Sequence, residues 1–209
     1  MFSQNLKGRR SKFSSPFFYA IVIKLKRIVI KNWKTYQSSF KNEELNGYRI
    51  KHEAYFNALN FKLRDGIYYT VRNYHTVELY APNEKESIAT DDFPNTMAMR
   101  EISEVIKKNN YTNLLIGGLG LGLILDNLPP ENITVAEYFP EVVQLVGKYY
   151  PKYKIINADF FEELSSGKYD LAFEDIIPFP SPENELKEHL RKINEVKGNT
   201  EVLSASLIY

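Results

Sequence analysis

Apolar runs typical of buried strands alternate with helix-type spacing over the second half of the chain. The strand-like runs lie at residues 113–117, 133–137, 154–157, 170–174 and 201–208. Apolar positions at helical spacing lie at residues 95–108, 121–128, 140–150 and 183–196. This alternation predicts an α/β fold, a Rossmann-like, mostly parallel sheet of about five strands with flanking helices, over residues 95–209.

The preceding segment, residues 43–94, carries strand patterns of a different kind. Residues 48–52 alternate between polar and apolar, and residues 67–71 and 76–80 are rich in β-branched and aromatic side chains. The pair Asp65-Gly66 marks a hairpin turn between two such runs. We therefore expect a small antiparallel β segment before the main domain.

The first 42 residues form a third region, which is strongly basic. They carry ten Lys and Arg and no Asp or Glu, whereas the remaining chain has 17 basic and 26 acidic residues. Residues 1–16 are a polar arm, and the apolar spacing over residues 17–34 predicts a basic amphipathic helix. Three occupants fit its apolar face: the chain's own body or a second copy, an anionic membrane surface, or nucleic acid.

No segment of the N-terminal region reads as a membrane span or a secretory signal. The longest uncharged run there, residues 13–23, is too short to cross a bilayer. No small-residue cleavage pattern follows the apolar positions. We expect a cytoplasmic protein.

Composition excludes several kinds of chemistry. The chain has no cysteine, which excludes disulfides, thiolate-bound zinc and thiol nucleophiles. The three histidines, His52, His75 and His189, are far apart in sequence, and no metal site is predicted.

Four of the ten glycines occur within six positions, at residues 117–122, directly after the first strand of the main domain. Glycine at such a turn lets a ligand approach the backbone, so we expect a small molecule at Gly118, Gly120 and Gly122. The third glycine of the dinucleotide motif is replaced by Leu123, which favours a ligand without pyrophosphate. No Lys-Ser/Thr pair follows, which excludes a P-loop.

Polar residues at the next two strand ends fit an adenosine-bearing ligand. Glu137 follows Gly118 by 19 residues, the spacing at which a carboxylate accepts hydrogen bonds from ribose hydroxyls. Asp159, after the third strand, is predicted to receive the adenine amino group, with Tyr138 or Phe160 against the ring.

Four segments together resemble the class I S-adenosylmethionine-dependent transferases, and within them the spermidine-synthase-like proteins. These segments are LLIGGLGLG (114–122), VAEYFPEVV (135–143), NADF (157–160) and YDLAFED (169–175). The resemblance implies S-adenosylmethionine as the cofactor, bound by the three glycines, Glu137 and Asp159. It also implies that Asp175 matches the acidic residue beside the reacting group.

Two departures from polyamine synthases favour methyl transfer over aminopropyl transfer. The family's Tyr-His-Glu segment is replaced by residues 95–97, and Ile176 stands where a second acidic residue is expected. Asp175, or Glu174 beside it, is the candidate general base for an acceptor that the sequence does not identify. An aminopropyltransferase, and an inactive structural or interaction subunit that retains the fold, remain as alternatives.

Overall fold

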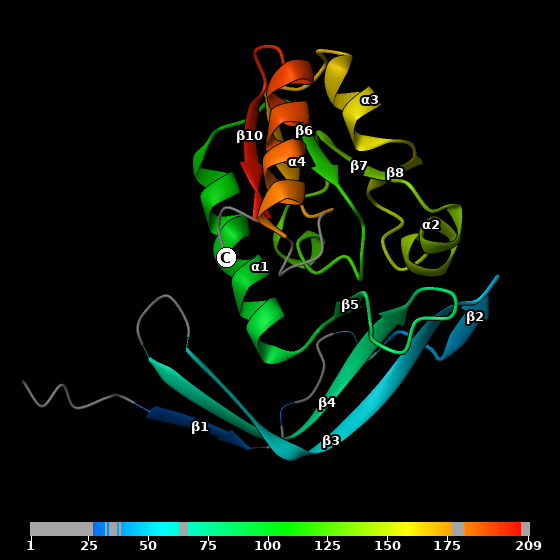
Figure 1. Cartoon of the computed structure of the whole chain (residues 1–209), viewed down its shortest axis with the longest axis vertical. Coiled ribbons are helices and arrows are strands. Elements are labelled where there is room, and N and C mark those ends of the chain that lie inside the picture. The colour runs from blue at the N-terminus through cyan, green and yellow to red at the C-terminus, as the bar shows by residue number, and fades with distance from the viewer. Residues whose placement is uncertain are drawn as a thin grey trace, which may run out of the picture.

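The computed structural model of the protein describes residues 27–31, 33, 37, 39–62, 67–176 and 182–205. Within this part of the chain there are two five-stranded sheets, and helix α1 (Phe93–Lys108) leads from the first to the second (Figure 1). The predicted α/β fold with a preceding antiparallel segment is confirmed.

The second sheet is parallel throughout, in the order β10-β9-β6-β7-β8. Its strands are β6 (Leu114–Gly117), β7 (Ile133–Glu137), β8 (Lys154–Asn157), β9 (Leu171–Glu174) and β10 (Glu201–Ser204). Strands β6, β7 and β9 are buried along their whole length, as expected of strands that are covered on both faces. The chain moves outward from β6 to β8 and then returns to β9 on the other side of β6, so the strand order reverses between β6 and β9.

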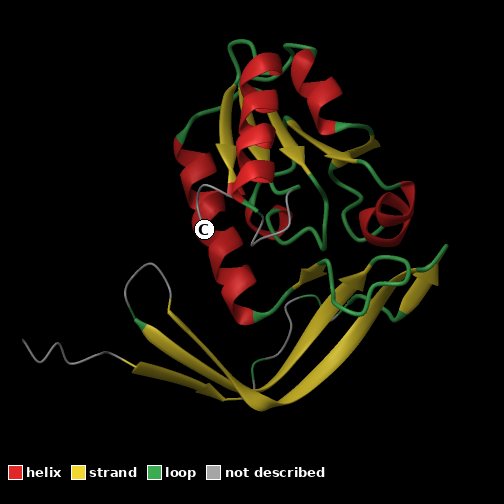
Figure 2. Ribbon diagram, in the orientation of Figure 1, coloured by secondary structure: helices red, strands yellow, loops and turns green. Residues whose placement is uncertain are grey.

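Alternating side chains divide the core into two layers. Leu114, Ile116 and Phe173 share a cluster with residues of α1 and α2 (Pro140–Gly147). Leu115 and Ala172 belong to a second cluster with residues of α3 (Phe160–Ser165) and α4 (Glu183–Val196). Helices therefore cover both faces of the parallel sheet (Figure 2).

Three of the four predicted helices are confirmed by α1, α2 and α4, and the helix predicted over residues 121–128 is wrong. That segment contains turns and one 3₁₀ turn, η1 (Leu125–Asn127). Gly120 and Gly122 have φ of +48° and +74°, outside the right-handed helical region, and Pro129 and Pro130 follow too closely for a helix to recover. The short helix α3 was not predicted; the Asp159 side chain caps its first turn.

The first sheet is built on one long hairpin. Strands β3 (Tyr48–Lys62) and β4 (Tyr68–Tyr80) pair antiparallel, and β2 (Glu43–Leu45) and β5 (Ala89–Thr90) add to their edges. The predicted short strands merge into these two, with one shift of register between Tyr55 and Ala58. The predicted turn at Asp65-Gly66 lies outside the described residues.

Strand β1 (Arg27–Lys31) corrects the prediction of an N-terminal amphipathic helix. It pairs parallel to β4 over Tyr68–Arg72, so residues 27–31 are not helical. The consecutive residues Ile28, Val29 and Ile30 favour a strand because β-branched side chains lose rotamer freedom in a helix. The rest of the predicted helix that precedes β1 lies outside the described residues. In the described chain, no helix combines the length and apolarity that crossing a bilayer requires.

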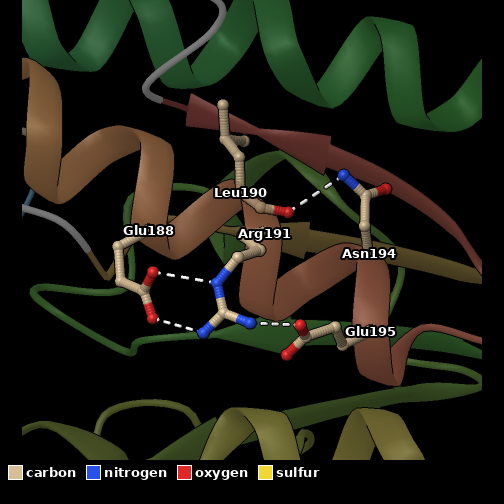
Figure 3. Close-up of polar contacts among 5 residues, drawn as sticks. All are labelled: Glu188, Leu190, Arg191, Asn194 and Glu195. Carbon is tan, nitrogen blue, oxygen red and sulfur yellow. Dashed lines mark hydrogen bonds and ion pairs between the residues drawn. The ribbon is translucent and has the colours of Figure 1, made fainter.

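On helix α4, Arg191 is paired with two carboxylates of the same helix (Figure 3). The Arg191 guanidinium is held by Glu188, at 2.6 and 2.9 Å, and by Glu195. The Asn194 amide donates to the Leu190 carbonyl. Such exposed pairs stabilise a helix by only a few tenths of a kcal/mol each.

The antiparallel sheet is fastened to the parallel one through the α2 region. The ring of Phe40 stacks on Tyr149 at 4.0 Å, and the Tyr149 hydroxyl donates to Glu43. The Asn46 amide donates to Glu141 at the start of α2. The carboxyl ends of the parallel strands consequently point toward the antiparallel sheet (Figure 1).

Candidate functional site

The polar residues predicted to bind a ligand lie along the carboxyl edge of the parallel sheet. The glycine loop follows β6, Glu137 ends β7, Asp159 follows β8 and Asp175 follows β9. Strand β5 approaches this edge: a Cβ built on Gly120 would lie 3.6 Å from the Cβ of Ala89. Because the strand order reverses here, this is the place where open α/β sheets bind ligands.

Glu137 connects the end of β7 to the glycine loop. Its Oε2 accepts a hydrogen bond from the Leu119 backbone N–H at 2.8 Å, and its Oε1 accepts one from the Phe139 N–H at 2.9 Å. The residue is only 6% exposed. Each carboxylate oxygen has a second lone pair, so Glu137 retains acceptor capacity for two ribose hydroxyls.

Two of the glycines are required by packing within the protein itself. A Cβ on Gly117 would lie 2.5 Å from the Phe160 ring, and a Cβ on Gly122 would lie 2.3 Å from the Tyr150 ring. Real Cβ atoms do not approach rings this closely, so these positions exclude any side chain.

The other two glycines differ from each other. A Cβ on Gly118, where φ is +83°, would lie 3.0 Å from the Asp175 carbonyl oxygen. Gly120 has only the ordinary contact with Ala89, and its φ of +48° is the constraint on a side chain. Packing against another side chain therefore accounts for Gly117 and Gly122 but not for Gly120.

The two aromatic candidates for stacking on a base have different environments. Phe160 is 3% exposed and packs in the core beneath Gly117, whereas Tyr138 is 65% exposed. Beside them, Oδ1 of Asp159 accepts the backbone N–H of Phe161 and Glu162 at the start of α3. Tyr138 is the aromatic side chain whose surface is free to meet a ligand.

Glu174 and Asp175, adjacent in sequence, have different surroundings. Glu174 is 1% exposed and accepts a hydrogen bond from the Ser204 hydroxyl, and the Nε2 atom of His189 on α4 lies 3.1 Å from its Oε2. Asp175 is exposed beyond the end of β9. Only Asp175 of the two predicted bases is open to an acceptor.

The buried group of Glu174, Ser204 and His189 was not predicted. Ser204 lies directly opposite Glu174 in the register between β9 and β10. A predicted pairing of β9 with β10 would have indicated the contact between Glu174 and Ser204, because side chains opposite each other on neighbouring parallel strands lie on the same face of the sheet. His189 comes from a distant helix, and sequence spacing contains no sign of the contact.

The pKa of Asp175 suits a group that exchanges protons near neutrality. Although the Asp175 side chain is open to solvent, desolvation by the surrounding protein and the nearby Glu174 carboxylate together raise its pKa to about 6. Above that pH the carboxylate is anionic and able to accept a proton.

Asp91 and Asp92, which precede α1, have structural partners. Asp91 is fully buried, and its Oδ1 accepts the Val77 backbone N–H at 2.6 Å. Asp92 is the N-cap of α1 and accepts the Asn95 N–H. Burial raises the pKa of both carboxyls, that of Asp91 to about 6.

Comparison with known proteins identifies no family. No protein-family model matches the chain, and no curated protein matches it. Among solved structures, a proposed caffeoyl-CoA O-methyltransferase from Staphylococcus aureus is 18% identical over 54% of this chain and 58% of the other, with a TM-score of 0.38. A proposed RNA methyltransferase from Pyrococcus horikoshii is 17% identical over 53% of this chain and 59% of the other, with a TM-score of 0.35. The matched region spans less than two thirds of either protein, and likeness of this degree says nothing about the reaction.

Substitution at Gly122 tests the packing of the glycine loop. Gly122→Ala places a methyl group against the Tyr150 ring at positive φ, whereas Gly167→Ala has positive φ and no atom within 4 Å. Both variants lose about 1 kcal/mol of stability from the left-handed backbone, and Gly122→Ala loses a further 1–3 kcal/mol, roughly the cost of overpacking. Urea unfolding measures the free energy of unfolding of both variants. Equal losses in the two variants would show that the packing of the Tyr150 ring does not require a glycine at position 122.

Proposed function

We propose that the chain is an S-adenosylmethionine-dependent methyltransferase. The observation that carries the proposal is the position of Glu137, a buried carboxylate that is bonded to the glycine loop at the reversal of strand order. This arrangement offers a ribose-binding acceptor directly beside the glycine loop.

Each predicted cofactor residue has a place in this proposal. Glu137 accepts the ribose hydroxyls, Asp159 receives the adenine amino group, and Tyr138 stacks on the base. The glycine loop at Gly118, Gly120 and Gly122 borders the remainder of the cofactor. Phe160 supports the loop from the core, in contact with Gly117.

The proposed chemistry requires little covalent participation by the protein. S-adenosylmethionine, when bound, supplies an electrophilic methyl group on a sulfonium sulfur. The protein orients the acceptor for in-line attack, and Asp175 accepts a proton where the acceptor must lose one. Glu174 is bonded to Ser204 and close to His189, and this burial leaves Asp175 as the proposed base.

The burial of Glu174 also bears on aminopropyl transfer. A pocket for a polycationic amine needs several carboxylates near the reacting amine. Asp175 has the buried Glu174 on one side in the chain and Ile176 on the other. Methyl transfer is therefore the better supported of the two transfers.

An inactive subunit is the second candidate, and the glycine loop favours it. Gly117 and Gly122 are explained by Phe160 and Tyr150, and Gly118 lies against the Asp175 backbone. A loop that is glycine-rich for internal packing does not require a cofactor. Ligand binding decides between the two candidates.

Cofactor binding is tested by a thermal shift with S-adenosylmethionine and S-adenosylhomocysteine. At about 100 times the dissociation constant, binding stabilises the folded state by roughly 2.7 kcal/mol. Tyr138→Ala weakens affinity by the loss of stacking, about 1–3 kcal/mol, and leaves the unliganded melting temperature unchanged because Tyr138 is exposed. Phe56→Ala, which alters an exposed aromatic residue of β3, is the matched control. No stabilisation by either ligand at millimolar concentration would support the inactive subunit.

The pH dependence tests Asp175. With labelled S-adenosylmethionine and an acceptor fraction from cell extract, methyl transfer that needs the Asp175 carboxylate rises with pH up to about 6 and then levels. Asp175→Asn is expected to abolish this rise with pH and to lower turnover by about 10²–10⁴-fold. Full turnover in the variant, with unchanged cofactor affinity, would refute the assignment.

The stability of Asp175→Asn provides the control for folding. A raised carboxyl pKa means that the folded protein binds the proton more tightly, so wild-type stability falls as pH rises from 3.8 to about 6. The variant lacks this loss. Its melting temperature at pH 7 should equal or exceed that of the wild type.

A further inference from the structure

A cavity of about 390 Å³ lies beside the glycine loop. It is lined by the first half of α1, by Tyr149 and Tyr150 after α2, and by Gln37, Ser39, Phe40, Leu123, Asp126 and Asn127. None of the predicted cofactor residues lines it. Its volume is within the range of small-molecule sites, about 300–1,000 Å³.

The segment after β6 forms one side of the cavity. It lies between α1 and α2 on one face of the sheet, since Ile124 and Leu125 share a cluster with Met99 and Leu145. Within this segment, Leu123, Asp126 and Asn127 line the cavity.

Two opposite charges line the cavity from different elements without pairing. Arg100 comes from α1 and Asp126 from η1, and within the described chain no ion pair joins them. Arg100 is exposed, and the described residues provide no hydrogen bond to its guanidinium, in contrast to Arg191 on α4 (Figure 3). The Asp126 Oδ1 accepts a hydrogen bond from the Tyr150 hydroxyl at 3.2 Å.

Three aromatic side chains, held in place by their neighbours, form another part of the wall. The Phe40 and Tyr149 rings are stacked, and the Tyr150 ring packs over Gly122. The Gln37 amide donates to the Tyr150 hydroxyl at 2.8 Å. Met97 adds a flexible apolar side chain from α1. The cavity therefore combines an aromatic and apolar part with polar side chains, among them one cationic and one anionic group.

We propose that this cavity binds a small zwitterion of the amino-acid type. The ammonium group is recognised by Asp126 and the carboxylate by Arg100, whose planar guanidinium suits a carboxylate. The apolar or aromatic side chain of the ligand lies along Phe40, Tyr149 and Met97. This ligand is separate from the cofactor at the carboxyl edge, and its binding does not depend on methyl transfer.

Isothermal titration calorimetry with L-phenylalanine, L-methionine and L-leucine tests the proposal. Phenethylamine and 3-phenylpropionate each retain one charge of phenylalanine, and each is expected to bind at least tenfold more weakly than the amino acid. Absence of saturable binding of all three amino acids up to about 10 mM, equivalent to less than roughly 3 kcal/mol, would overturn the proposal.

Charge variants locate the site. Arg100→Ala is expected to weaken phenylalanine binding at least tenfold and to leave phenethylamine unaffected. Asp126→Asn is expected to weaken phenylalanine equally and to leave 3-phenylpropionate unaffected. Lys107→Ala, on the same helix but outside the cavity, is the control and should change nothing.

Competition separates this site from the cofactor site. Phenylalanine affinity should persist in Tyr138→Ala and in the presence of S-adenosylhomocysteine. Binding that S-adenosylhomocysteine displaces, and that Arg100→Ala and Asp126→Asn leave intact, would place the amino acid at the carboxyl edge and refute the cavity. Because the calorimetric titrations with the amino acids and the charge variants need no cofactor, failure of the methyltransferase proposal and failure of this one are distinguishable.

Discussion

The bond between Glu137 and the Leu119 amide fixes the geometry on which the rest of the site depends. A carboxylate that is 6% exposed requires strong hydrogen bonds, and the N–H groups of Leu119 and Phe139 provide them. The bond holds the glycine loop against the end of β7. In that position the loop accommodates Phe160 under Gly117 and Tyr150 over Gly122, and so connects the two core layers of the parallel sheet.

The sequence predicted the parallel sheet well because its strands obey a local rule. A strand that is buried on both faces must be apolar along its length, and β6, β7 and β9 satisfy this. The helix predicted after β6 failed because apolar spacing carries no information about φ, and the loop turns left-handed at Gly120 and Gly122. Strand β1 was missed because its partner, β4, is about 40 residues away and hydrophobic periodicity records no such pairing.

The candidate site was predictable where it follows from topology and not where it depends on contacts. The placement of Glu137, Asp159 and Asp175 along one edge follows from parallel strands alone. The burial of Glu174 could not be predicted in this way, because its partners Ser204 and His189 come from β10 and α4. The glycines show the same limit, since a glycine that admits a ligand and one that admits a neighbouring ring look alike in sequence.

The glycine segment borders both proposed ligand sites, and the Tyr150 side chain contacts the segment and lines the cavity. Its ring forms part of the cavity wall and also occupies the space over Gly122, while its hydroxyl lies 3.0 Å from the Leu121 carbonyl. One side chain therefore belongs both to the wall of the cavity and to the packing of the glycine loop. A ligand that leaves Tyr150 in place also leaves the loop that Glu137 holds undisturbed, and the two sites then bind independently, because coupling requires that one ligand bias a state that the other binds.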